Sequence, residues 1–399
     1  MDAGAKSAIV ATLAAVALLV GGVQVAGVRG PASATVFQFS AAGDFGSWTG
    51  FTASLTELSM TASDFAIALG DLSYGGESEQ AWCQEFKRYF DNVLVIAGNH
   101  DTGQPPFNEG SINLFAAHCP YSLRERMVGE YGKQYYFDYP GGNPLARFIL
   151  VSPDLLFVVD HGEHYDYSAG TPRYNWTRDA IDGARTAGIP WVIVAMHKNC
   201  VAAGDHPCEI GTDLFNLLLE RRVDLIVQGH THHYARSKQL ALSAGPCAGI
   251  QLGTFLPGCI SDDGSDGQYL QGSGSVLVIA GTGGRDIDPF NPSDPYAGYF
   301  AAWQGTQPAN VGKGVVSFDV APDRLSVRTH LDGGFTDTYT IEGGSRQPSP
   351  VQDFLVVLGI VGAMSAGTGI VFVRRIGNVP KVPREPASRE GPSSSDERR

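Results

Sequence analysis

The chain has little positive charge: 28 Lys and Arg residues stand against 41 Asp and Glu residues, for a formal net charge of −13. This balance excludes binding to nucleic acid or anionic lipid by general electrostatic attraction. A phosphate substrate would therefore need locally supplied positive charge, and bound metal ions can supply it. No internal repeat is evident between residues 35 and 341. We interpret residues 35–342 as one domain, near the upper size that a single core sustains.

The N-terminal segment lacks charge over residues 7–28 and ends near the small residues Ala32, Ser33 and Ala34. This pattern predicts a signal peptide over residues 1–34, cleaved after Ala34. The alternative is an uncleaved anchor, because the uncharged run is long enough to span a bilayer.

A second uncharged run lies near the C-terminus and predicts a transmembrane helix over residues 354–373, after a linker over 343–353. Arg374 and Arg375 follow it directly, so the positive-inside rule places a disordered tail, residues 374–399, in the cytoplasm. The expected location is the cell membrane, with a single pass and the large domain on the extracytoplasmic side.

All six cysteines lie in the outward domain, and none is arranged as C-x-x-C. Such a distribution favours up to three disulfides in an oxidising compartment. The local pairs Cys200–Cys208 and Cys247–Cys259 are guesses, because composition does not fix connectivity. A zinc site that uses His206 is the competing interpretation.

Short apolar runs rich in β-branched residues alternate with stretches of helical periodicity, which predicts an α/β core. The expected strands are 36–40, 65–69, 93–97, 148–151, 155–160, 191–196, 225–228 and 276–280. The expected helices are 78–90, 175–187 and 212–221. A hairpin of residues 315–320 and 325–329 closes the domain and indicates a second sheet, with the two sheets packed between helices.

Polar residues that can bind metals follow five of the predicted strands at the point where each strand ends. Ligands in open α/β sheets bind beyond the carboxyl ends of the strands, so we expect these side chains to converge. The candidate ligands are Asp44, Asp71, Tyr74, Asn99, His197, His230 and His232.

Each of these motifs alone is most often an ordinary turn. Five of them at strand ends are hard to obtain by accident. Carboxylates suit hard cations, imidazoles suit transition metals, and a phenolate suits a strongly acidic ion. Two ions that share Asp71 would sit about 3.5–4 Å apart and hold the attacking and leaving oxygens of a phosphoryl transfer.

These motifs resemble the five ordered motifs of the purple acid phosphatases, within the calcineurin-like metallophosphoesterase superfamily. They read Gly-Asp-Phe-Gly at 43–46, Gly-Asp-Leu-Ser-Tyr at 70–74, Gly-Asn-His-Asp at 98–101, Val-Ala-Met-His at 194–197 and Gly-His-Thr-His at 229–232. Gly46 stands where the wider superfamily has a histidine, and Tyr74 stands where this branch has its tyrosinate ligand. The resemblance implies an αββα sandwich of two mixed sheets between helices.

The resemblance also implies two metal sites and a hydrolytic mechanism in which a metal-bound hydroxide attacks phosphorus. The divalent site would hold iron, zinc or manganese through Asp71, Asn99, His197 and His230. The ferric site would use Asp44, Asp71, Tyr74 and His232.

Next to a ligand, His100 is implied as the catalytic residue that orients the phosphate or protonates the leaving group. Asn99 and His100 would contact substrate, and His161, His164 and Lys198 are further candidates for the pocket wall. Many family members have another histidine beside the fourth-motif ligand, whereas Met196 and Lys198 flank His197 here.

The sequence thus predicts an acid phosphatase that is anchored in the membrane, faces outward and hydrolyses small-molecule phosphomonoesters. Two alternatives use the same scaffold: a phosphodiesterase or nucleotide pyrophosphatase, and a surface-binding module without catalysis. A redox role for the iron is a further alternative.

Overall fold

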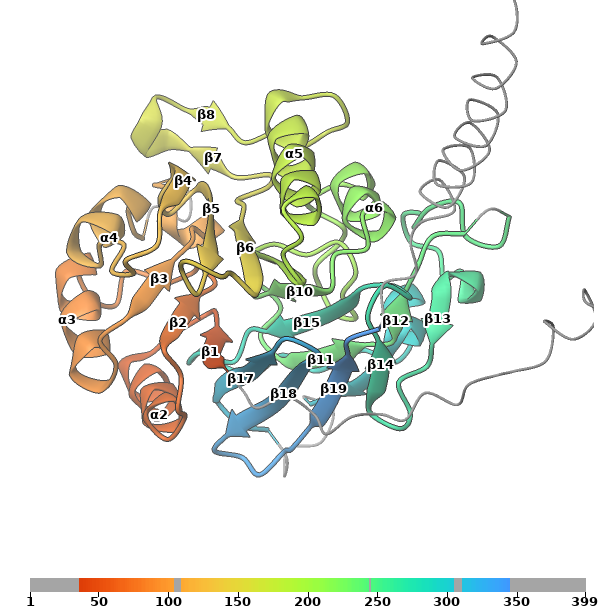
Figure 1. Ribbon diagram of the computed structural model, residues 1–399. Coiled ribbons are helices and arrows are strands. Elements are labelled where there is room, and N and C mark those ends of the chain that lie inside the picture. The colour runs from red at the N-terminus through yellow and green to blue at the C-terminus, as the bar shows by residue number, and fades with distance from the viewer. Residues whose placement is uncertain (1–35, 104–108, 244, 305–310, 345–399) are drawn as a thin grey trace, which may run out of the picture. The chain divides into compact units, whose positions relative to one another are not determined.

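Two mixed β-sheets form the centre of the domain in the computed structural model, which describes residues 36–103, 109–243, 245–304 and 311–344 (Figure 1). The seven-stranded sheet has the order β14 (Gln268–Leu270), β19 (Thr338–Glu342), β18 (Arg324–Leu331), β17 (Gly314–Ala321), β1 (Phe37–Ala42), β2 (Phe65–Ala68), β3 (Val93–Val95). The eight-stranded sheet has the order β16 (Phe300–Trp303), β11 (Tyr234–Ser237), β15 (Val276–Ala280), β10 (Leu225–Gln228), β9 (Trp191–Met196), β6 (Ala146–Leu150), β5 (Gln134–Tyr139), β4 (Met127–Glu130).

Strand alternation explains why each sheet is covered on both faces. In β1, Phe39 faces the second sheet, where its ring meets Phe148 of β6 edge-on at 4.9 Å. Ala42, three residues further along β1 and therefore on the other face, belongs to the layer that packs against helices. Successive side chains of a strand point to opposite faces, so buried apolar runs build two layers at once.

Five α-helices of the described residues cover the sheets: α2 (Trp48–Ser59), α3 (Glu79–Tyr89), α4 (Ile112–His118), α5 (Pro172–Thr186) and α6 (Thr212–Glu220). Phe51 of α2 stacks on Trp82 of α3 with ring centroids 5.2 Å apart, and both side chains are buried. The α/β prediction with two sheets between helices is confirmed for the described part of the chain.

The predicted strands agree with the structure except at residues 155–160. There only β7 (Leu156–Phe157) pairs, with β8 (Glu163–His164), and the 3-10 turn η2 (Val158–Asp160) follows. The strand prediction is wrong there because this apolar run is not fully buried: Val158 is 43% exposed. Helices α2 and α4 were not predicted, and Gly50 with three threonines weakens the helical signal of α2.

Parallel pairing brings the carboxyl ends of the site-bearing strands to one edge. Strand β1 pairs in parallel with β2, and β2 with β3; in the other sheet, β9 pairs in parallel with β10. The backbone N–H of Gly43, after β1, donates to the carbonyl of Ala280 at the end of β15, at 2.9 Å. The strand ends of the two sheets therefore meet.

Three disulfides connect the loops, and they include both guessed pairs, Cys200–Cys208 and Cys247–Cys259. The third, Cys83–Cys119, links α3 to the residue that ends α4. Cys200 and Cys208 are bonded to each other and have no free thiolate for a metal, which contradicts a Cys/His zinc site with His206.

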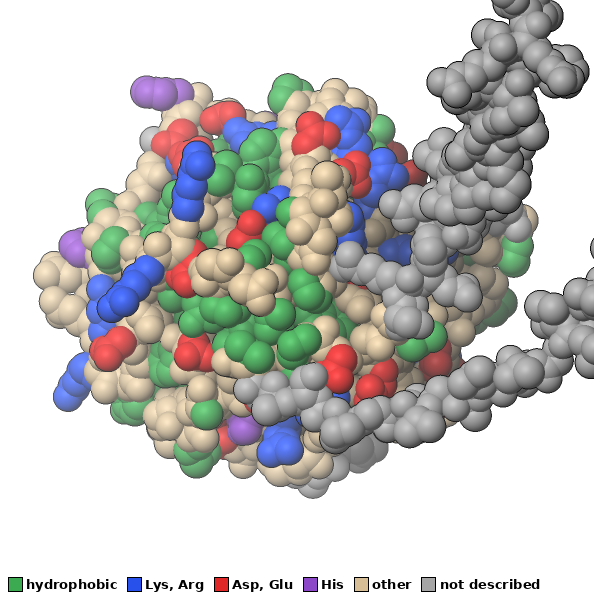
Figure 2. Space-filling model, viewed as in Figure 1, with side chains coloured by type: hydrophobic (Ala, Val, Ile, Leu, Met, Phe, Trp, Pro, Cys, Tyr) green, Lys and Arg blue, Asp and Glu red, His purple; other side chains and the backbone are tan. Residues whose placement is uncertain are grey.

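The predicted signal peptide (1–34), transmembrane helix (354–373) and tail (374–399) lie outside the described residues. Within the described ranges, none of the helices combines the length and apolar character that crossing a bilayer requires. On the face drawn in Figure 2, Lys and Arg side chains are interspersed with acidic and apolar ones and form no continuous basic patch.

Candidate metal centre

Four of the seven predicted ligands have a left-handed backbone, a conformation that is rare and strained for residues other than glycine. Their φ angles are 65° for Asp44, 53° for Asp71, 51° for Tyr74 and 72° for His230. Only three other non-glycine residues of the described chain have positive φ. Backbone strain is therefore concentrated at the ends of β1, β2 and β10, where it turns these side chains toward one another.

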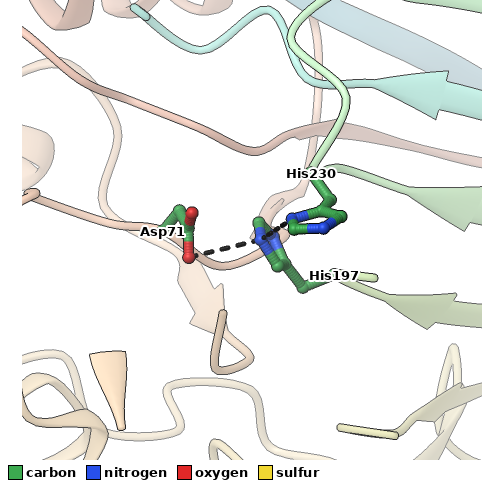
Figure 3. A group of neighbouring side chains, drawn as sticks. All are labelled: Asp71, His197 and His230. Carbon is green, nitrogen blue, oxygen red and sulfur yellow. Dashed lines mark hydrogen bonds and ion pairs between the residues drawn. The ribbon is translucent and has the colours of Figure 1, made fainter. Parts of the chain in front are cut away.

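The first group of side chains surrounds one imidazole nitrogen, Nε2 of His197. His197 donates from Nδ1 to the carbonyl of Leu69 at 2.8 Å, because a carbonyl oxygen can only accept. Its Nε2 then lies 3.2 Å from Asp71 Oδ1, 3.2 Å from Asn99 Oδ1 and 3.1 Å from His230 Nδ1. Figure 3 shows Asp71, His197 and His230 pointing toward a common centre. All four residues predicted to bind the divalent ion are thus brought together.

The second group lies beside the first. The hydroxyl of Tyr74 is 3.2 Å from Asp44 Oδ1 and 3.2 Å from His232 Nε2. His232 Nε2 and Asp44 Oδ1 are 3.6 Å apart. Asp44 Oδ1 is also 4.0 Å from His197 Nε2, which joins the two groups into one cluster of all seven side chains.

Within the described residues, the buried carboxylates of the cluster have no Lys or Arg partner. Asp44 and Asp71 are 0% and 2% exposed, and within the described residues their ion-pair partners are all imidazoles. Burial raises the pKa of Asp44. Buried carboxylates normally need a paired cation or a metal. Metal ions at this position would supply the missing charge.

The histidines of the first group have opposite electrostatic environments. Burial alone would lower the pKa of His197, but Asp71 and Asp44 raise it to about 9. For His230, burial lowers the pKa to about 4, so its ring is neutral at pH 7. A proton on His197 therefore occupies the position where a metal would bind, and a neutral His230 offers the lone pair that a metal requires.

Each of the three clustered histidines has a hydrogen-bond or ion-pair partner at its far nitrogen. Leu69 is that partner for His197, as described above. His230 Nε2 lies 3.0 Å from Glu209 Oε1, and His232 Nδ1 lies 3.3 Å from Asp288 Oδ2. Such partners fix the tautomer and ring orientation of metal-binding histidines. The arrangement fits metal binding, because the nitrogen nearer the cluster is the one left for a ligand.

Asp101 holds two of the strand ends together and was not predicted to act. Its buried carboxylate accepts backbone hydrogen bonds from Asp71 at 2.7 Å, Gly98 at 2.8 Å and Leu72 at 3.0 Å. Gly98 is required at this junction, since a Cβ there would lie 2.0 Å from Asp71 Oδ1. Asp101 belongs to the motif at 98–101, but only the fold shows that its side chain connects the end of β3 to the end of β2.

Glu209 was also missed, because a lone glutamate outside the motifs carries no signal. It lies just after the loop closed by Cys200–Cys208, and its Oε2 is 2.8 Å from Lys198 Nζ. Lys198 also donates to Asp154 Oδ2 at 2.8 Å. The predicted pocket-wall lysine is thus held by two carboxylates, and it positions the partner of His230. His206 contacts the same site, with its ring 3.9 Å from that of His230.

His100 borders the cluster. Its backbone N–H donates to Asp71 Oδ1 at 3.0 Å, its side chain contacts Glu109, and its ring lies 4.3 Å from the ring of Tyr74. His161 and His164 are exposed instead, around the β7–β8 pair. His164 Nε2 lies 3.3 Å from Asp154, and within the described chain no contact joins either histidine to the seven clustered side chains.

Comparisons with known proteins agree with this geometry. The calcineurin-like phosphoesterase family matches residues 42–234. Probable purple acid phosphatase 20 of Arabidopsis thaliana is 26% identical over 220 residues, covering 52% of this chain and 48% of its own. Fe(3+)-Zn(2+) purple acid phosphatase 12 of the same plant is 21% identical over 283 residues, covering 66% and 54%. The chain therefore spans about half the length of these curated relatives.

A solved structure shows the same fold. Purple acid phosphatase PPD1 from yellow lupin seeds superposes with a TM-score of 0.57 at 17% identity, covering 80% of this chain and 56% of that one. Together, the matched motifs, the fold and the buried Asp/His cluster define the class as a calcineurin-like metallophosphoesterase. Within that class, the chain is distantly homologous to the purple acid phosphatases.

Proposed function

We propose that the domain is an acid phosphatase that hydrolyses phosphomonoesters with two metal ions, one ferric and one divalent. The observation that carries the proposal is the Tyr74 hydroxyl, which lies 3.2 Å from both Asp44 and His232 beside the Asp71, His197 and His230 group. A tyrosine among carboxylate and imidazole ligands suits a hard trivalent ion. The iron and zinc in the name of one relative, Fe(3+)-Zn(2+) purple acid phosphatase 12, support the same choice of metals.

The proposed ligands fall into the same two groups as the contacts described above. Asp71 would serve both ions. The ferric ion would also bind Asp44, Tyr74 and His232, and the divalent iron, zinc or manganese ion would bind Asn99, His197 and His230. Bound metals neutralise phosphate charge and acidify a coordinated water.

The protein's own groups then orient the ester. His100 is the residue that we propose to hold the phosphate or to protonate the leaving oxygen, because its ring borders Tyr74 at the rim of the cluster. Asn99 is a second proposed substrate contact. His161 and His164 are exposed, and in the described chain neither contacts the clustered side chains, so we do not assign them a direct role.

We further propose that the domain, residues 35–342, faces an extracytoplasmic space and is anchored by the C-terminal segment 354–373. The three disulfides support an oxidising compartment. Fractionation with protease protection of the full chain tests this proposal. Recovery of the whole chain in the soluble fraction would contradict the anchor.

The colour and activity of the purified protein test the function. A ferric tyrosinate absorbs visible light, so we expect a coloured protein that contains iron and hydrolyses p-nitrophenyl phosphate faster than its bis ester. Tyr74→Phe should abolish the visible band and preserve the fold. A colourless, active zinc or manganese protein would overturn the ferric assignment alone. Preference for the bis ester would favour a phosphodiesterase, and no hydrolysis of any ester from acid to alkaline pH would favour a binding module.

A further inference from the structure

A single arginine reaches the ring of Tyr74 from the loop that follows β15. The carbon at the centre of the Arg285 guanidinium lies 4.5 Å from the centroid of the Tyr74 ring. The backbone N–H of Arg285 donates to the carbonyl of Asp44 at 2.9 Å. The same residue is thus fixed to the β1 end of the metal centre through its backbone and to the β2 end through its side chain.

Gly46 makes room for this side chain. A Cβ at residue 46 would lie 2.5 Å from Cδ of Arg285 and 2.7 Å from its Cα, and the φ angle of Gly46 is 54°. Any larger residue at position 46 would displace Arg285. The glycine that distinguishes the first motif of this chain therefore has a physical consequence: it allows a cation to lie over Tyr74.

Arg285 also differs from Lys198, another basic residue next to the site. Lys198 is bound by Asp154 and Glu209, so its charge is balanced within the protein. The Arg285 side chain is exposed, and among the described residues it has no carboxylate partner. An exposed guanidinium with its five donors in a planar fork is suited to the oxygens of a phosphate.

We propose that Arg285 is a substrate-binding residue that contacts the non-bridging oxygens of the phosphoryl group, and that stacking on Tyr74 positions its guanidinium. The inference rests on the proposed phosphatase function and extends it. His100 borders the same tyrosine ring, with 4.3 Å between the ring centroids. A phosphate at the hydroxyl end of Tyr74 would thus meet a fixed cation as well as an imidazole.

Inorganic phosphate, used as a competitive inhibitor of p-nitrophenyl phosphate hydrolysis, tests the proposal in the full chain. In Arg285→Gln we expect the inhibition constant of phosphate and the KM to rise roughly tenfold or more, because charged hydrogen bonds to the ligand are lost. The kcat should change less. Arg285→Lys should recover part of the affinity, since it restores charge without the planar fork.

Arg328→Gln is the matched control, because it removes one positive charge from an exposed position on β18, outside the metal centre. It should leave phosphate inhibition unchanged. A second readout is the visible band: loss of a cation stacked on the phenolate should move the band to longer wavelength in Arg285→Gln and leave it in place in Arg328→Gln.

Failure of this inference can be separated from failure of the proposed function. An active wild-type protein whose phosphate inhibition and KM are the same in Arg285→Gln overturns the role of Arg285 and leaves phosphatase activity intact. A wild-type protein that neither hydrolyses phosphate esters nor binds phosphate overturns both. Thermal unfolding of each variant shows whether a loss of affinity reflects a loss of fold.

Discussion

The core between the two sheets and the carboxylates at their carboxyl edge are both buried, yet the two regions are built on opposite principles. In the core, Phe39, Phe65 and Phe148 fill the space with rings at contact distance and carry no charge. At the edge, Asp44 and Asp71 are equally buried, have strained backbones and have imidazoles, with no Lys or Arg in the described chain, as ion-pair partners. The first region supplies stability by itself, and the second requires an added cation.

This difference separates stability from function. Burial of aromatic surface is favourable in any apolar setting, so core positions are judged by volume and packing. Burial of carboxylates is unfavourable unless an opposite charge is added. The edge therefore lowers the stability of the metal-free fold, and its residues serve binding. Substitutions in the two regions should therefore act on different measurements.

The largest expected effect is at Asp44. Asp44→Asn retains the size of the side chain and removes its charge, so we expect kcat/KM to fall roughly a thousandfold or more, as for loss of metal stabilisation. Because burial raises the pKa of Asp44, the folded chain accommodates the ionised form poorly at pH 7. The thermal midpoint of the metal-free protein should therefore not fall. A large fall in that midpoint would remove the contrast between the two regions.

The next effect is the reverse case, in the core. Phe39→Ala removes a ring that contacts Phe318, Phe65 and Phe148, and we expect the free energy of unfolding to drop by about 3–5 kcal/mol. The kcat of the folded fraction should remain within about twofold of wild type, since the ring packs in the core between the sheets and contacts none of the seven clustered side chains in the described chain. Val36→Ala is the control. Val36 directly precedes β1 and is 53% exposed, so its substitution should leave the free energy of unfolding nearly unchanged.

Asp101 lies between these extremes, because it is a structural residue within the edge. Asp101→Asn offers a single oxygen to three backbone N–H donors, so we expect a loss of about 1–3 kcal/mol of stability from unpaired groups. Metal content and activity should fall with it, since the same bonds hold the loops of Asp71 and Asn99. Chemical denaturation and metal analysis of one preparation would measure both, and an effect on stability without any on metal content would separate the two roles.

The extent to which sequence predicts this molecule follows the same division. Strands β9, β10 and β15 were predicted at their observed ends, because parallel buried strands are continuous apolar runs. The metal-binding motifs were visible because each combined a strand end with a ligand-type side chain. Glu209, Asp288 and Arg285 were not predicted, since they stand in loops and acquire their roles only through long-range contacts. Helix α2 was missed for a local reason, its low helix propensity.

The smallest expected effect concerns one of those unpredicted residues and tests whether the edge extends beyond its ligands. Glu209 accepts from His230 Nε2 and balances Lys198, so Glu209→Gln should weaken the hold on the imidazole and lower the affinity for the divalent ion about 10- to 100-fold. Competition with a chelator measures this affinity directly. Glu220→Gln, at the end of α6 with a side chain 58% exposed, removes the same charge away from the cluster and should leave metal affinity unchanged.

Because a carboxylate at Glu209 acts through His230, activity at saturating metal should recover in Glu209→Gln, whereas it cannot recover in Asp44→Asn. Equal metal affinity in Glu209→Gln and wild type would show that the ligands alone set the metal affinity and that Glu209 does not contribute.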